Sequence, residues 1–220
     1  MALLGLLKRK EYYLPTLRGW LLLLVVLVGL LVVLVRGLFW FLAPTAPTDA
    51  EILVVEGWLP DKALEKAVRE FRSHNYRLLV TTGGPLREGS YLSAYKSYAE
   101  LSAASIRLLG IQDSQLVAVP APLVKEDRTY TSAVALKHWM EKSGYRPRGL
   151  NLFSLGAHAR RSRLMFEKAL GPDIAVGVIA VEDPDYDPRL WWTSSSGVRD
   201  VLDEAIGYAY AAILFHPKKD

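Results

Sequence analysis

One histidine and three arginines follow a short apolar segment late in the chain. The segment is residues 150–155, and His158, Arg160, Arg161 and Arg163 come soon after it. An arginine stays charged and binds carboxylates or phosphates through a rigid fork of donors. A histidine adds a group that exchanges protons near neutral pH. This combination predicts a site for a negatively charged ligand, with His158 as a general acid or base or as a donor to the anion.

Two further candidate groups each follow an earlier apolar segment. Glu56 ends one of them, and its carboxylate could act as a base, accept a ligand hydroxyl or pair with the arginines. Thr82, Gly83 and Gly84 end the other. Two glycines let a backbone approach a ligand closely and present N–H groups to an anion, although an ordinary turn explains them equally well.

Another candidate lies just before a predicted helix. Arg128 is placed to contact an anion, and Thr129 is assigned to the same ligand site. Asp127 or Thr129 could instead cap the helix, because side-chain oxygens of these residue types accept from the first free N–H groups.

The loop after the last predicted strand is acidic and aromatic. Residues 182–187 could hold a divalent cation, but they lack the spacing of a calcium loop, and Asp/Pro-rich runs are usually turns. We therefore predict no metal site. Trp191 and Trp192 are expected to form a wall of the ligand site, to lie at a membrane interface or simply to pack on the domain.

Several function classes are disfavoured by what the chain lacks. It contains no cysteine, which excludes disulfides, thiol catalysis and cysteine zinc sites. It has no Gly-x-Ser-x-Gly elbow, Walker loop or GxGxxG fingerprint. The net charge of +4 belongs entirely to residues 1–42, so the remainder is neutral and gives no reason to expect nucleic-acid binding.

The candidate residues must be positioned by strands that alternate with helices. Strands are predicted at 51–55, 77–81, 116–119, 150–155 and 174–181, and helices at 61–74, 91–109, 129–142, 159–170 and 198–214. This alternation predicts an α/β domain of three layers, with a mostly parallel five-stranded sheet between helices. Ligands bind such sheets at the carboxyl ends of the strands, where the candidates lie.

An apolar N-terminal segment predicts one transmembrane helix before this domain. Residues 19–42 are long enough to span a bilayer, and the basic residues that precede them place the N-terminus in the cytoplasm and the domain outside. A cleaved signal peptide is the alternative, but its apolar core would be shorter. The expected parts are a basic N-terminus (1–18), an anchor (19–42), a stiff linker (43–49), the α/β domain (50–215) and a tail (216–220).

An ordered set of short motifs resembles the YdcF/SanA/ElyC-like family of bacterial envelope proteins. The set comprises Val54-Val55-Glu56-Gly57, Thr82-Gly83-Gly84, Leu109-Gly110-Ile111, Arg128-Thr129-Tyr130-Thr131-Ser132-Ala133, His158-Ala159-Arg160-Arg161 and Glu204-Ala205-Ile206-Gly207-Tyr208. The resemblance implies a Rossmann-like fold, a membrane anchor, a role in the cell envelope and a place for Glu204 in the site. Tyr91 to Ala94, Glu56 and Trp58 depart from the family pattern.

These features together predict a membrane-anchored envelope protein that binds an anionic, phosphorylated or lipid-linked precursor. His158, Arg161 and Arg128 would hold the anion, and phosphoryl or glycosyl transfer or hydrolysis is the chemistry that a His/Arg/Glu set would suit. One alternative is a non-catalytic envelope factor that acts through membrane protein partners. Another is a nucleotide or S-adenosylmethionine binder. The sequence does not identify a cofactor.

Overall fold

Five parallel strands form the centre of the fold in the computed structural model, which describes residues 12–87 and 91–217. The strands are β1 (Ile52–Glu56), β2 (Leu78–Gly83), β3 (Leu116–Pro120), β4 (Gly149–Leu155) and β5 (Ala175–Val181). Their spatial order is β3-β2-β1-β4-β5, and each neighbouring pair is parallel. The predicted α/β class with a five-stranded parallel sheet is thus confirmed.

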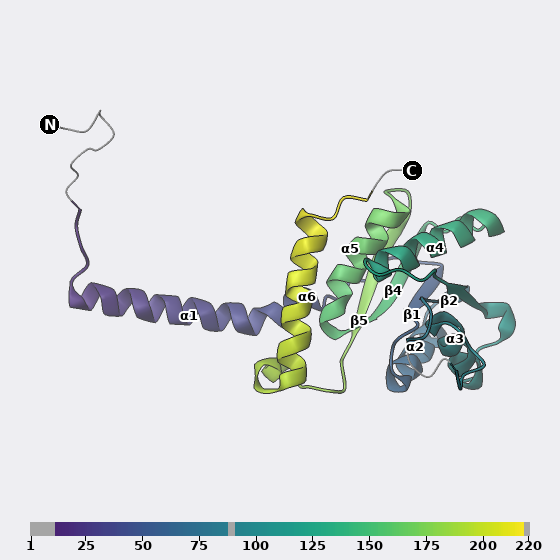
Figure 1. The fold of residues 1–220 in the computed structure, drawn as a ribbon, viewed down its shortest axis with the longest axis horizontal. Helices are drawn as coiled ribbons and strands as arrows, with labels where there is room; N and C mark the ends of the chain where they lie inside the picture. The colour runs from purple at the N-terminus through teal and green to yellow at the C-terminus, as the bar shows by residue number, and fades with distance from the viewer. Residues whose placement is uncertain (1–11, 88–90, 218–220) are drawn as a thin grey trace, which may run out of the picture. The chain divides into compact units, whose positions relative to one another are not determined.

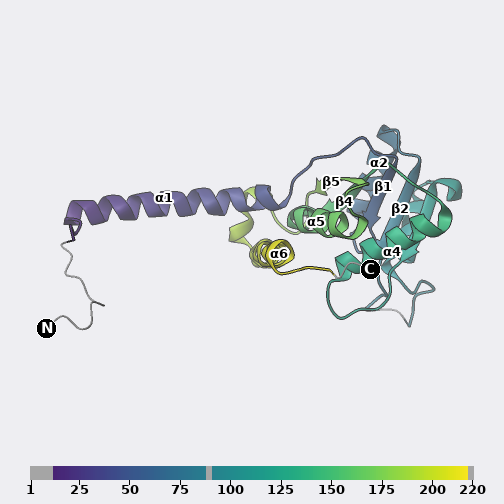
Figure 2. The ribbon, with the colours of Figure 1, turned by 90° about the horizontal axis from the view of Figure 1, so that it is seen from above.

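Helices cover both faces of this sheet (Figures 1 and 2). The helices of the chain are α1 (Leu17–Leu42), α2 (Asp61–Ser73), α3 (Tyr98–Leu108), α4 (Arg128–Ser143), α5 (Ala159–Leu170) and α6 (Ser195–Ile213), with short 3-10 turns at Asp113–Gln115, Gly156–His158 and Pro188–Thr193. Helices α2 and α3 pack on one face, α4 and α5 on the other, and α6 packs on α5. The architecture is Rossmann-like.

Alternate residues of β1 supply the two apolar cores. Ile52 and Val54 face the core under α4 and α5, whereas Leu53 and Val55 face the core under α2 and α3. Successive side chains of a strand point to opposite faces, and a strand that is covered on both sides reads as a continuous apolar run. This explains why residues 52–55 are all apolar.

The strand order reverses beside β1. The chain runs outward from β1 through β2 to β3 and then crosses over to β4, on the other side of β1. In open α/β sheets, the carboxyl edge at such a reversal is where ligands bind. Glu56 ends β1 here, and His158 follows β4.

The predicted elements agree with the structure within three residues, except at α3. We expected that helix to start near Tyr91, but it starts at Tyr98. Ser97 accepts from the Glu100 N–H, and the Glu100 carboxylate accepts from the Ser97 N–H, so a capping box fixes the start. Residues 88–90, which come just before the expected start of this helix, lie outside the described residues.

Helix α1 is long and apolar enough to cross a membrane. The chain divides into two units, residues 1–37 and 38–220, so the last turn of α1 belongs to the folded unit. Phe39 and Leu42 are buried there, and Phe39 packs edge-on against Tyr186. Packing therefore begins before residue 42, which is earlier than the predicted domain boundary.

The linker after α1 is bound to the sheet. Ala46 exchanges two backbone hydrogen bonds with Val178 of β5. The amide of Asn151 accepts from the Thr48 N–H and donates to the Thr48 carbonyl. A Cβ atom on Gly177 would lie 2.0 Å from Asn151 Oδ1 and 2.6 Å from Thr48 N, so only glycine fits beneath the linker.

Candidate functional site

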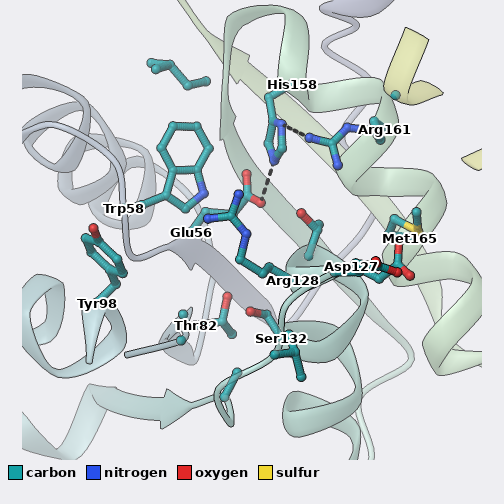
Figure 3. Close-up of a pocket in the computed structure, with 18 of the residues that line it drawn as sticks. Glu56, Trp58, Thr82, Tyr98, Asp127, Arg128, Ser132, His158, Arg161 and Met165 are labelled. Carbon is teal, nitrogen blue, oxygen red and sulfur yellow. Dashed lines mark hydrogen bonds and ion pairs between the residues drawn. The ribbon is translucent and has the colours of Figure 1, made fainter. Parts of the chain in front are cut away.

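A cavity of about 710 Å³ opens at the carboxyl edge of the sheet (Figure 3). Its walls are the ends of β1, β2 and β4, the first turn of α4 and the middle of α6. Nine of the predicted site residues line it: Glu56, Thr82, Gly83, Gly84, Arg128, Thr129, His158, Arg161 and Glu204. The topology therefore brings together residues that are up to 148 positions apart in the chain.

The Glu56 carboxylate lies at the bottom of this site. Glu56 is only 4 % exposed and accepts hydrogen bonds from Ser154 Oγ (2.5 Å) and Ser162 Oγ (2.9 Å). Ser154 is on β4, one residue beyond the point where that strand pairs with Val55. Neither serine is among the site residues predicted from the sequence, although Ser162 stands four residues after His158 and so shares its side of α5.

The His158 ring lies between two carboxylates. Its Nδ1 is 2.7 Å from Glu204 Oε1, and its Nε2 is 3.3 Å from Glu56 Oε1, an ion-pair distance without hydrogen-bond geometry. Trp58 packs edge-on against the ring at 5.1 Å. Figure 3 shows Trp58, Glu56 and His158 on the same side of the cavity.

The charges of this cluster keep it ionised. Burial alone would lower the pKa of His158, but the charge of Glu56 and the hydrogen bond and charge of Glu204 outweigh it and raise that pKa to about 9. Burial alone would raise the pKa of Glu204, but Arg161 and His158 lower it to about 2. The pKa of Glu56 is also lowered, because His158 and the two serines outweigh its burial. His158 is thus an imidazolium at neutral pH.

Arg161 completes the cluster. Its Nε donates to Glu204 Oε2 (2.7 Å) and its Nη2 donates to Glu204 Oε1 (2.9 Å), a bidentate pair. Nη2 also lies 2.9 Å from His158 Nδ1. Because that nitrogen carries a proton in the imidazolium, we assign Glu204 as the acceptor for both cations. We call Glu56, His158, Arg161 and Glu204 the buried tetrad.

The other arginines after His158 do not enter the cavity. Arg160 donates to the Phe41 carbonyl, and its guanidinium lies 4.1 Å from the centre of the Phe41 ring. Arg163 pairs with Glu167 one turn further along α5. The structure therefore places Arg160, a predicted ligand residue, outside the cavity: successive helix positions point in different directions, and Arg160 and Arg163 each contact a protein group.

Arg128 differs from these arginines. It is exposed, lines the cavity and makes no hydrogen bond or ion pair with any residue that the structure describes. Its side chain extends into the cavity in Figure 3. Arg128 also begins α4, whose N-cap residue Asp127 makes no side-chain capping bond. The first N–H groups of a helix attract anions, and they lie here beside a cation.

Asp127 has an unusual backbone conformation. Its φ of 51° and ψ of 40° place it in the left-handed region, the one non-glycine example among the described residues. Aspartate tolerates this region better than most residues, yet such conformations persist where the surrounding structure enforces them and often mark functional sites. The expected side-chain cap by Asp127 or Thr129 is not formed, and the start of α4 lines the cavity.

The two glycines after β2 have different reasons to be glycine. A Cβ atom on Gly83 would lie 2.9 Å from the Tyr98 Cβ, so its absence lets α3 approach the strand. A Cβ atom on Gly84 would make only an ordinary van der Waals contact, 3.8 Å from the Pro122 carbonyl oxygen, so packing does not require glycine there. Packing explains Gly83, and Gly84 is the position where a ligand can approach the backbone.

Acidic groups line the opposite wall. Asp200 and Asp203 come from α6, and Asp183 comes from the loop after β5. Burial raises the pKa of Asp200 and of Asp183; the charge of Asp183 adds to the rise at Asp200, and the charge of Asp185 adds to the rise at Asp183. No group of three or more acidic or histidine side chains within the described ranges is arranged to hold a metal ion. The cavity is thus lined by both basic and acidic side chains, and Glu126 and Asp127 stand beside Arg128.

Trp191 does not line the cavity. It is 4 % exposed, packs edge-on against Trp192 and sits in the 3-10 turn before α6. A Cβ atom on Gly197 would come within 2.4 Å of the Trp191 carbonyl oxygen, so this turn lies tightly against α6. Of the alternatives for Trp191, the structure shows packing on the domain, which buries it, and Trp58 is a tryptophan that lines the cavity.

No protein-family model matches the chain, and no curated protein matches it either.

Proposed function

We propose that this protein is a membrane-anchored binding protein for a phosphorylated ligand of the cell envelope. The ligand would occupy the cavity at the carboxyl edge of the sheet. Its phosphate would lie between Arg128, the start of α4 and the Gly84 backbone. Its hydroxyl or amino groups would contact Asp200 and Asp203 on the other wall.

Arg128 is the observation that carries this proposal. The Arg128 guanidinium can bind a phosphate without breaking an ion pair within the protein, whereas Arg161 would first have to leave Glu204. Helix N–H groups beside the guanidinium add donors that are directed at the same space. Arg87 and Lys125 line the cavity as well and add positive charge, part of which Glu126 and Asp127 offset.

The buried tetrad has a supporting role in this proposal. Both nitrogens of the His158 ring face carboxylates, and its pKa of about 9 means that it already holds its proton at neutral pH. It is therefore a poor general base, and Glu56, whose pKa is lowered, is also a weak one. The tetrad fixes β1, α5 and α6 relative to one another around the ligand.

The membrane part of the proposal rests on α1 and on the distribution of charge in the sequence. Helix α1 would cross the bilayer, and Lys8, Arg9, Lys10 and Arg18 would hold the N-terminus in the cytoplasm. The α/β domain would then face the extracytoplasmic side, where envelope precursors are exposed.

A thermal-shift panel on the full chain in detergent micelles tests this function. The probes are inorganic phosphate, nucleotide sugars, a polyprenyl phosphate and S-adenosylmethionine. A ligand at about 100 times its dissociation constant should stabilise the protein by roughly 2.7 kcal/mol. Arg128→Ala should weaken binding of a phosphorylated probe by about 10- to 100-fold, as expected for loss of a charge-assisted hydrogen bond.

Arg189→Ala is the matched control, because Arg189 is exposed and lies outside the cavity. It should bind the probe like the wild type. A phosphorylated probe that binds the wild type and Arg128→Ala equally would contradict the assigned phosphate position. Failure of every phosphorylated probe would contradict the function itself.

A further inference from the structure

An apolar stripe runs along the outer side of α6. It consists of Leu202, Ile206, Ala209, Tyr210 and Ile213, which recur at spacings of three and four residues and so share one side of the helix. Ile206 and Ile213 are 70 % and 69 % exposed, and Leu202 and Tyr210 are 44 % and 42 % exposed. We call these five residues the outer stripe.

The packing of α6 on the domain does not account for the outer stripe, except at Tyr210, which also lines the cavity and packs against Phe215. Val201 and Ala211, on the other side of the helix, are fully buried, and Glu204 joins the tetrad. A helix that is packed on one side only is normally polar on its solvent side. A contiguous exposed apolar surface of this kind marks a contact with a protein partner or a membrane.

The position of α6 in the domain favours a membrane. Phe41 packs edge-on against Tyr208 of α6, with ring centres 5.5 Å apart. The folded unit begins at Leu38, only three residues before Phe41. Helix α6 therefore adjoins the point where the chain would leave the bilayer, and Tyr210 is of a residue type that settles at a membrane interface.

We propose that the outer stripe lies in the boundary between the headgroups and acyl chains of the bilayer that α1 crosses. This proposal rests on the anchoring in the proposed function. It also places the cavity near the membrane surface, because Asp203, Glu204 and Gly207 of the same helix line the cavity. A ligand whose phosphate is attached to a lipid would then enter without leaving the bilayer.

Spin labelling of the full chain tests the proposal directly, because the protein has no cysteine. A nitroxide on Ile206→Cys is compared with one on Glu65→Cys, an exposed control position on α2. Both chains are reconstituted in vesicles of phosphatidylethanolamine and phosphatidylglycerol. The ratio of relaxation by oxygen to relaxation by a water-soluble nickel chelate should be several-fold higher at position 206. Equal ratios at the two positions would overturn the proposal.

Two further readouts separate the other outcomes. Spin–spin broadening at position 206 that disappears on dilution with unlabelled protein would show that a second copy covers the stripe, and it would overturn the membrane assignment. A chain that does not float with the vesicles would overturn the anchor together with the stripe. Binding of inorganic phosphate that depends on Arg128, measured on the same labelled chains, reports on the proposed function independently of both.

Discussion

His158 is held by one carboxylate on each side of its ring, and this makes stability depend on pH. Its pKa is about 9 in the fold against an ordinary 6.5, so the folded state binds the proton more tightly than the unfolded state does. The stabilisation is complete below about pH 6.5 and is lost as the pH rises through about 9. Glu204 behaves oppositely: its contribution is present above about pH 4.5 and is lost as the pH falls through about 2.

We therefore expect the melting temperature of the wild type to fall between pH 6.5 and 9 more steeply than that of His158→Gln. Glutamine keeps a polar side chain of similar reach but has no proton to release in this range. Melting of both proteins across a pH series measures the difference. Parallel curves would contradict the assignment, and an NMR titration of the wild-type imidazole provides a check that requires no variant.

The location of the site could be predicted from the sequence, but the ion pairs between its residues could not. Glu56, Gly84 and His158 each follow a buried strand, and parallel strands bring their carboxyl ends to one edge. Whether an arginine in a run meets a ligand or a protein carboxylate depends on which side of α6 packs inward. In this fold Glu204 faces Arg161 and forms an ion pair with it, which the residue spacing on α5 alone could not predict.

At the scale of elements, the linker and β5 depend on one glycine. A Cβ atom on Gly177 would overlap Asn151 Oδ1 and Thr48 N. We expect Gly177→Ala to destabilise the fold by about 1–3 kcal/mol, the usual cost of overpacking. It should also increase protease cleavage within residues 43–49, because the linker must move aside. Chemical denaturation and limited proteolysis measure the two effects.

Gly37→Ala is the control for this substitution, since no atom outside its own helix backbone and chain neighbours lies within 4 Å of the added Cβ. It should leave stability within about 0.5 kcal/mol of the wild type. An unchanged cleavage rate in Gly177→Ala would show that the linker does not depend on this close approach.

The elements differed in how well the sequence defined them. Strands such as residues 150–155 and the helix 159–170 have clear apolar patterns and distinct ends, and the structure places them within one residue. The start of α3 was predicted too early because Tyr91 to Ala94 suit a helix locally. Ser97 and Glu100 fix the start, and that capping pair was visible in the sequence.

At the scale of the whole molecule, helix α1 and the domain share residues. Phe39 and Leu42 close α1 and are also buried in the folded unit. Burial of such side chains stabilises a fold by about 1.5–3 kcal/mol each. Residues up to 42 were predicted to belong only to a membrane anchor, because an apolar helix end that packs on a domain has the same composition as one that lies in lipid.

Two truncated chains test this arrangement. Residues 38–220 retain Phe39, Leu42 and the linker, whereas residues 50–220 lose all three. We expect the shorter chain to melt at a clearly lower temperature and to have the lower free energy of unfolding. Equal melting of the two chains would mean that the contacts of residues 38–49 contribute nothing to stability.

The linker also has a consequence for what happens if the chain is cut between α1 and β1. Strand β5 is at one edge of the sheet, and Ala46 occupies the middle of that edge through its two hydrogen bonds to Val178. Unpaired strand edges bind other strands and promote aggregation. A protease that cut close after Ala46 would separate the domain from α1 and would also expose the β5 edge of the sheet. The resulting fragment would be the form prone to self-association.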